Sequence, residues 1–144
     1  MDTSEIYVKM CRGVEEIQKW HELQAGDFYK SGGTGEIVLL PMEHHIKDFC
    51  NYWCLYLVGG DDTIWLPRQD QLQAMVTDFS LGIWSLMAKF GRWCDEWGGQ
   101  SRTLYSGEQL WLGFVMKEKF NKIWDGQEWT IKVGEPALGG GRNA

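Results

Sequence analysis

Hydrophobic side chains recur every three or four positions over much of the chain, which is the spacing that places them on one face of an α-helix. The most complete stretch begins at Ser106, which together with Gln109 matches a capping box, and we therefore expect a helix to start at Gly107. Its apolar face comprises Leu112, Met116, Phe120 and Ile123. Further apolar residues surround the first turns, so this half should be buried on most sides. The pair Asp125-Gly126 is expected to end the helix, because glycine adopts the left-handed conformation without steric cost.

A second amphipathic stretch lies at the beginning of the sequence. Residues 2–5 offer a cap, with Asp2 as the capping residue and Glu5 as its partner. One helix that ends before Ala25 is predicted from the apolar residues Ile6, Met10, Val14, Ile17 and Trp20. Gly13 falls inside this helix, where a glycine costs about 1 kcal/mol relative to alanine. Its predicted solvent face is Glu15, Glu16 and Lys19.

Short apolar segments separated by turns predict an antiparallel sheet. Residues 26–41 contain two such segments around a glycine-rich turn and are interpreted as a hairpin. A second hairpin is predicted from residues 56–58 and 63–66, while the preceding stretch fits either a short helix or a strand. Alternating apolar and polar residues at 129–133 indicate a further half-buried strand.

Two more helices are expected between the second hairpin and Ser106. Asp70 is the expected N-cap of the first of them, with Gln73 as the partner three residues on. Its predicted core residues are Leu72, Met75, Val76, Phe79 and Ile83. The helical pattern continues to Trp93, with a break expected at Ser80 or Gly82.

These elements predict an α+β fold in which amphipathic helices pack on a small antiparallel sheet. A length of 144 residues with 44% hydrophobic side chains suits one hydrophobic core. We therefore expect a single compact domain over residues 1–133. The glycine-rich residues 134–144 are expected to form a flexible tail.

Charge and hydropathy narrow the expected environment. No apolar run approaches the roughly 20 residues that span a bilayer, and residues 1–5 lack the basic start of a signal peptide. The sequence thus predicts a cytoplasmic protein without a membrane partner. A net charge of −6 argues against direct nucleic-acid binding through phosphate neutralisation.

Cysteine and tryptophan are the residue types that raise questions of chemistry. His44 or His45 with Cys50 and Cys54 could supply zinc ligands, but we favour the interpretation that the cysteines act as small apolar residues, with no metal and no cofactor. Nine tryptophans exceed what one small core can enclose, so some are expected at the surface, where they suit base stacking or a protein interface. The alternative is that these tryptophans only pack around the rim of the hydrophobic core and bind nothing.

A candidate binding site follows from residues that have no role in the hydrophobic pattern. Arg68, Gln69 and Gln71 lie where a strand leads into a helix N-terminus, which favours an anion. The alternative is that Arg68 only pairs with Asp70 or Asp62 to fix the turn. The full set of predicted ligand-binding residues is Trp65, Arg68, Gln69, Gln71, Trp111 and Lys117, with Lys119 and Lys122 as further candidates for a phosphate contact.

No sequence motif of a hydrolase, metalloprotease, nucleotide-triphosphatase or dinucleotide-binding enzyme occurs, so we expect a non-catalytic protein. A resemblance adds to this expectation. The chain resembles a family of small uncharacterised proteins from phages and prophages of Gram-positive bacteria in residues 6–11, 15–18, 26–28, 64–73 and 108–119. The resemblance implies a phage accessory protein in the host cytoplasm and supplies no functional residues.

The expected function is therefore that of a binder that antagonises bacterial antiviral defence. In the favoured form it sequesters a small nucleotide signal, with tryptophan stacking on the base and Arg68 or a lysine at the phosphate. In the alternative form it binds a host defence protein directly, through an aromatic patch or an acidic surface that mimics nucleic acid. A structural or regulatory phage protein, and a homo-oligomer, also remain open.

Overall fold

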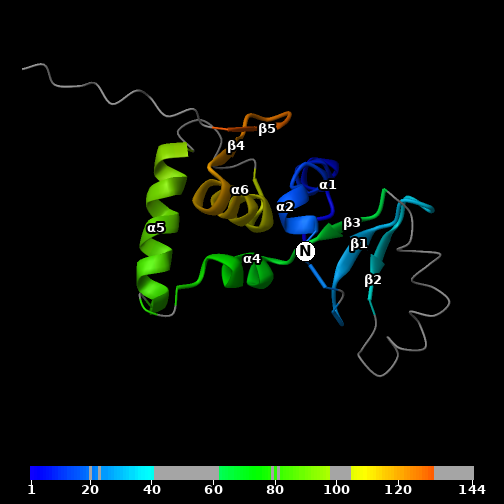
Figure 1. Ribbon diagram of the computed structural model, residues 1–144, viewed down its shortest axis with the longest axis horizontal. Helices are drawn as coiled ribbons and strands as arrows, with labels where there is room; N and C mark the ends of the chain where they lie inside the picture. The colour runs from blue at the N-terminus through cyan, green and yellow to red at the C-terminus, as the bar shows by residue number, and fades with distance from the viewer. Residues whose placement is uncertain are drawn as a thin grey trace, which may run out of the picture.

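Figure 1 shows the computed structural model, which describes residues 1–19, 21–22, 24–40, 62–78, 80, 82–97 and 105–131. The helices of this part are α1 (Glu5–Arg12), α2 (Glu15–Gln18), α4 (Gln69–Val76), α5 (Gly82–Trp97) and α6 (Gly107–Phe120). The strands are β1 (Phe28–Lys30), β2 (Ile37–Leu39), β3 (Ile64–Leu66), β4 (Lys122–Trp124) and β5 (Trp129–Ile131). The fold is α+β, as the hydrophobic pattern predicts. The predicted tail at residues 134–144 lies outside the described residues.

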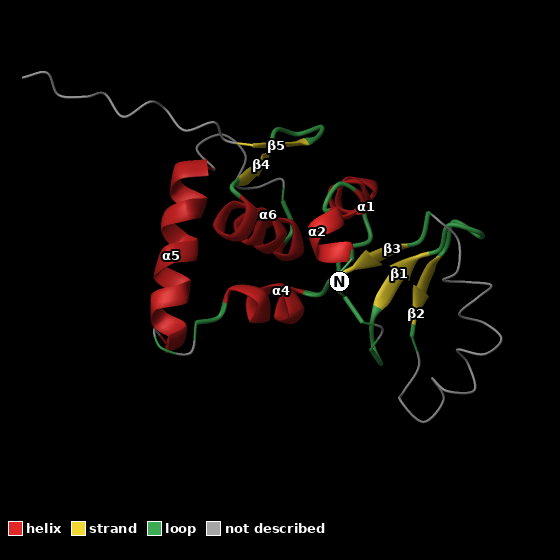
Figure 2. Ribbon diagram, in the orientation of Figure 1, coloured by secondary structure: helices red, strands yellow, loops and turns green. Residues whose placement is uncertain are grey.

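The larger sheet is antiparallel, with the strand order β2-β1-β3. Tyr29 of the central strand β1 is paired with Val38 on one side and with Trp65 on the other. The hairpin predicted over residues 26–41 is thereby confirmed. The strand at 63–66 also forms, but the partner predicted for it at 56–58 lies outside the described residues. Figure 2 shows this sheet on one side of the molecule, α4, α5 and α6 on the other, and α1 and α2 between them.

The first predicted helix is divided into α1 and α2. Ser4, and not Asp2, caps α1, because its Oγ accepts a hydrogen bond from the Tyr7 N–H at 3.3 Å. The Asp2 carboxylate instead accepts from the Ser106 hydroxyl and from Gln109 Nε2, and so ties the start of the chain to α6. The buried face of α1 is Tyr7, Met10 and Cys11, whereas the predicted core residue Ile6 is 53% exposed.

Gly13 lies at the break between α1 and α2, where the side chain of Trp129 packs on the backbone. A Cβ atom at Gly13 would come within 2.7 Å of Trp129 Cδ1, closer than two carbon atoms approach without a shift. The Trp129 indole N–H donates at 2.9 Å to the Met10 carbonyl oxygen near the end of α1, which also accepts from the Gly13 backbone N–H at 3.2 Å. Glycine is therefore required here by packing, which the sequence pattern did not indicate.

The start of α6 at Gly107 and its Ser106 cap agree with the prediction, but the end of the helix does not. The return bond of the predicted capping box is also not formed, because Gln109 Nε2 donates to Asp2 and Gln109 Oε1 has no hydrogen-bond partner among the described residues. Ser106 Oγ accepts from the Gln109 N–H at 3.1 Å, and the helix is buried on all sides through its middle turns. It ends at Phe120, because Asn121 adopts the left-handed conformation with φ of 53°. The predicted stop at Asp125-Gly126 is instead the turn between β4 and β5, so Ile123 belongs to a strand.

The helices α4 and α5 are separate, and the break between Val76 and Gly82 includes the predicted position Ser80. The other predicted position, Gly82, begins α5 with φ of +71°. The predicted cap Asp70 is wrong by two residues. Arg68 occupies the N-cap position, and Gln71 Oε1 accepts from its backbone N–H at 2.9 Å, which leaves Asp70 in the first turn. Ile83, predicted in the core, is 57% exposed because α5 turns Leu86 and not Ile83 toward the interior. The predicted core residue Phe79 lies outside the described residues.

Aromatic side chains fill the space between α5 and α6. Phe90 stacks on Trp111 with ring centroids 3.9 Å apart and planes within 2° of parallel. Trp93 stacks in turn on Trp97 at 4.9 Å. These contacts absorb several of the tryptophans into the core, but Trp84 on the opposite face of α5 is 84% exposed. The prediction that some tryptophans reach the surface is confirmed at this position.

Replacing Trp129 with alanine is expected to lower the free energy of unfolding by about 2–3 kcal/mol, because the variant loses the Met10 hydrogen bond and the packing on Gly13. Chemical denaturation followed by circular dichroism measures the change. Ile131→Ala is the control, since Ile131 lies on the same strand with 65% of its surface exposed, and it should change stability by no more than about 0.5 kcal/mol. Equal effects of the two substitutions would contradict the described position of β5.

Candidate functional site

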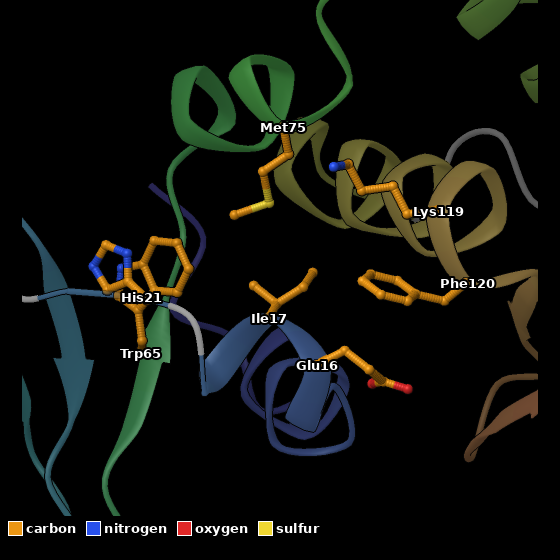
Figure 3. Close-up of a pocket in the computed structure, with 7 residues that line it drawn as sticks. All are labelled: Glu16, Ile17, His21, Trp65, Met75, Lys119 and Phe120. Carbon is orange, nitrogen blue, oxygen red and sulfur yellow. The ribbon is translucent and has the colours of Figure 1, made fainter.

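A cavity of about 300 Å³ lies where α2, β3, α4 and the end of α6 meet. Figure 3 shows the side chains around it, which come from these elements and from the segment after α2. Its lining residues are Glu16, Ile17, His21, Trp65, Met75, Lys119 and Phe120. Apolar walls with a few polar groups at fixed positions are the usual make-up of a small-molecule site.

Trp65 forms one wall of the cavity, and Gln18 and His21 hold it in position. Its backbone N–H donates to Gln18 Oε1 at 2.9 Å, and its carbonyl accepts from Gln18 Nε2 at 2.8 Å. The side chain of Gln18 thus pairs with β3 as a neighbouring strand would. His21 covers the indole, with ring centroids 3.3 Å apart and planes within 2° of parallel. The wall is therefore held both at its backbone and at its ring.

His21 is held in turn by a carboxylate behind it. Asp27 has no exposed surface, and its Oδ2 lies 2.6 Å from His21 Nε2 and accepts from the Gln24 N–H at 2.7 Å. The other oxygen, Oδ1, accepts from Gln71 Nε2 at 2.6 Å and lies 3.8 Å from Arg68 Nη1. A buried carboxylate needs such donors, since an unpaired one is strongly disfavoured. Asp27 thereby joins the segment after α2 to the start of α4.

Two buried polar atoms of lining residues have no hydrogen-bond partner. They are Trp65 Nε1, a donor, and Glu16 Oε2, an acceptor; within the described residues the same holds only for Gln109 Oε1, which lies elsewhere. Buried polar groups are nearly always paired, so two exceptions at one cavity need a reason. The two atoms lie at opposite ends of the lining, because Figure 3 shows the Glu16 carboxylate directed away from Trp65, so separate groups of a bound molecule would have to meet them.

Both negatively and positively charged side chains, Glu16 and Lys119, lie at the cavity. Lys122 donates to Glu16 Oε1 and pairs with it. Burial acts to raise the pKa of Glu16, but the Lys122 hydrogen bond and charge outweigh it, and the pKa lies below its ordinary value. Glu16 is therefore an ionised, compensated carboxylate. Lys119, by contrast, makes no ion pair or hydrogen bond with any residue in the described ranges, and Figure 3 shows its side chain extending toward Met75.

The structure brings only part of the predicted site together. Trp65 lines the cavity, and Arg68 and Gln71 lie behind it at Asp27. Arg68 also forms a two-point contact with Asp70, at 3.0 and 3.2 Å, and donates to the Gly26 carbonyl at 2.6 Å. This is the pairing that the alternative interpretation of Arg68 proposes.

The remaining predicted residues lie away from the cavity. Gln69 is at the start of α4, with its Oε1 against Gly107. Trp111 is stacked under Phe90 in the aromatic core, and Lys117 donates to Asn121 Oδ1 at 3.1 Å. Whether any of the predicted residues contacts a ligand remains a prediction.

Most lining residues were assigned other roles by the sequence pattern. Ile17, Met75 and Phe120 have the spacing of core residues, and Glu16 that of a solvent face. Lys119 was one of three lysines considered for a phosphate, and its place next to Phe120 in the last turn of α6 is what brings it to the cavity. The sequence offered only a weak indication of the cavity-lining residues. Hydrophobic spacing assigns a residue to a helix face, but it does not show which helices pack with their ends together.

A metal site and a membrane-spanning helix were sought in the described part of the chain. The residues considered for zinc, His44, His45, Cys50 and Cys54, lie outside it. Among the described residues, no group of three or more histidine, cysteine, aspartate or glutamate side chains could hold a metal ion. No helix in these same ranges is long and apolar enough to cross a bilayer.

Comparison with known proteins yields no match to a family model, to a curated protein or to a solved structure. The fold and the cavity described above are therefore the basis for a functional proposal.

Substitution of Arg68 by alanine is expected to lower the free energy of unfolding by about 1–2 kcal/mol at neutral pH, because the Gly26 carbonyl and Asp70 lose their donor. The Arg68 hydrogen bond holds the pKa of Asp70 below its ordinary value of 3.8. This contribution is present above pH 3.8 and is lost as the pH falls through the lowered pKa of the folded state. The deficit of the variant should thus shrink in acid.

Denaturation of wild type and Arg68→Ala between pH 7 and about pH 2 tests this expectation. Gln69→Ala, in the same turn but exposed, is the control and should be nearly neutral. An unchanged stability of Arg68→Ala at pH 7 would count against the structural role and in favour of a ligand role.

Proposed function

We propose that the protein is a non-catalytic phage accessory protein that sequesters a small nucleotide signal of bacterial antiviral defence, with the base held in the cavity around Trp65. The phage origin and the host cytoplasm are what the sequence resemblance implies, and the defence role is inferred from a small, acidic phage protein that has no reaction motif and an excess of tryptophan. The cavity supports the part of the proposal that concerns a small ligand.

The unpaired donor and acceptor at the cavity carry this proposal. Trp65 Nε1 is a hydrogen-bond donor, and Glu16 Oε2 is a hydrogen-bond acceptor. A nucleobase edge carries ring nitrogens or carbonyl oxygens that accept and N–H groups that donate, and separate groups of one nucleotide can therefore meet the Trp65 donor and the Glu16 acceptor. The apolar walls formed by Ile17, Met75 and Phe120 suit the faces of such a ring.

Lys119 supports the phosphate part of the ligand. It lies in the last turn of α6 at the cavity rim, and its ammonium group lacks a carboxylate partner among the residues that the structure describes. A lysine acts as a flexible point charge toward phosphate. Glu16 does not oppose this attraction strongly, because its charge is paired with Lys122.

Lys119→Ala is expected to weaken nucleotide binding by about tenfold, the usual consequence of losing a charge-assisted contact. Native mass spectrometry and tryptophan fluorescence with a panel of mono-, di- and trinucleotides measure it. Lys117→Ala removes the same charge from the same helix at a residue outside the cavity, and should bind as wild type does. If no member of the panel binds the wild-type protein, the nucleotide proposal fails.

A second candidate function, direct binding of a host defence protein, is favoured by the surface of α5. Ile83, Trp84 and Met87 are 57%, 84% and 42% exposed, and their spacing places them together on the side of the helix that faces away from α6. Exposed tryptophan is typical of residues that dominate protein interfaces. This patch is separate from the cavity residues.

Trp84→Ser separates the two candidates. It should leave nucleotide binding and melting temperature unchanged, because the side chain is 84% exposed and does not line the cavity. Loss of protection against host defence in infected cells, with nucleotide binding intact, would favour the protein partner. Sedimentation velocity of the wild type and of Trp84→Ser shows whether the patch instead joins two copies of this chain.

A further inference from the structure

A second cavity, of about 240 Å³, lies between α4, α5 and α6. It shares two lining residues, Met75 and Lys119, with the cavity around Trp65. The two cavities therefore flank a single pair of side chains, one from α4 and one from α6. We call them the inner lobe, around Trp65, and the outer lobe, which is lined among others by Leu86, Lys89, Phe114 and Glu118.

The size of the lobes indicates a ligand that occupies both. Pockets for drug-sized molecules measure roughly 300–1,000 Å³, so each lobe alone is at or below the lower limit. Together the lobes, with volumes of about 300 and 240 Å³, lie within this range. A ligand with two compact groups joined by a narrow bridge matches their arrangement better than one compact group does.

The chemistry of the outer lobe resembles that of the inner one. Leu86 and Phe114 provide an apolar floor, with 7% and 1% of their surfaces exposed. Glu118 offers acceptor oxygens at its rim, as Glu16 does in the inner lobe. Each lobe thus combines an apolar surface with a carboxylate that can accept from a base amino group.

The positive charges around Met75 and Lys119, the two residues that both lobes share, favour a ligand whose two groups are joined by an anionic linker. Lys119 lines both lobes, and Lys89 of α5 lines the outer one. Their two positive charges exceed the single charge of Glu118, whereas Glu16 is compensated by Lys122. A phosphodiester between two bases would place its negative charge at Lys119, within reach of a second cation on the outer side.

We propose that the two lobes form one site for a dinucleotide, with one base in each lobe and the phosphodiester at Lys119. This inference rests on the proposed nucleotide function and specifies its ligand class. The same chemistry occurs at the end of a single-stranded nucleic acid. The net charge of −6 disfavours a long polyanion, which would extend beyond the lysines at the lobes, and so favours a free dinucleotide.

Calorimetric titration of the full chain with matched ligands tests the inference. The probes are the mononucleotide, the linear dinucleotide, the cyclic dinucleotide and the single-stranded hexanucleotide, each with adenine, guanine, cytosine and uracil. For at least one base, a dinucleotide should bind at least about tenfold more tightly than the mononucleotide, because linkage makes the second binding event intramolecular.

Lys89→Ala tests whether the tighter binding of the dinucleotide depends on the outer lobe. It should remove most of the dinucleotide advantage, with a larger loss of dinucleotide affinity than of mononucleotide affinity, whereas Lys119→Ala should weaken both by similar factors. Arg92→Ala is the control, since Arg92 is an exposed cation on the same helix that does not line the lobe. Thermal melting confirms that each variant is folded.

The outcomes separate the two proposals. Mononucleotide binding with no gain for any dinucleotide, or a gain that Lys89→Ala and Arg92→Ala reduce equally, overturns the two-lobe site and leaves the nucleotide function standing. A hexanucleotide that binds more tightly than every dinucleotide overturns the free dinucleotide as ligand. Failure of all probes overturns the nucleotide function and the inference together.

Discussion

The buried carboxylate of Asp27 is the interaction on which the arrangement of sheet and helices depends. A charge without access to water is tolerated only where donors surround it, and Asp27 takes them from a backbone N–H, from His21 and from Gln71. The first two donors belong to the segment after α2, and Gln71 belongs to α4. The carboxylate thereby fixes the segment before β1 relative to α4, and it also orients the histidine that covers Trp65.

Removal of one member of such a network leaves the others buried without a partner, so the network acts as a unit. One wall of the inner lobe is consequently rigid. The opposite wall, formed by the last turn of α6, is held by Asn121 in its left-handed conformation and by the strand pair that follows. A cavity between two independently fixed walls retains its shape without a ligand, which reduces the entropic cost of binding.

Local sequence predicted those features that local chemistry determines. The Ser106 cap, the hairpin over residues 26–41 and the break before α5 all depend on residues within a few positions of each other. Errors occur where a distant residue decides. Asp2 is not a cap because Ser106 and Gln109 engage it, and Gly13 interrupts a helix because Trp129 packs there. Hydrophobic periodicity contains no information about either partner.

The candidate site shows the same division. Arg68 and Gln71 stand out in sequence because the hydrophobic pattern leaves them unexplained, and the structure shows them serving Asp27, whose burial could not be anticipated from a Gly-Asp pair at a turn. Residues that line the cavity, such as Ile17 and Phe120, looked ordinary because they share the spacing of the core. A pocket built from the ends of several helices becomes visible only when those ends are placed together.

The hydrogen bonds that join the first helices to the last elements also bear on how the chain folds. Met10 is paired with Trp129 and Asp2 with Gln109, across separations of 119 and 107 residues. Contacts this distant in sequence raise the entropic cost of loop closure and slow folding. During synthesis α1 would emerge long before its partners, with Tyr7 and Met10 uncovered. Completion of the core thus waits for α6 and β5 to leave the ribosome, and a chain halted before them would remain incompletely folded.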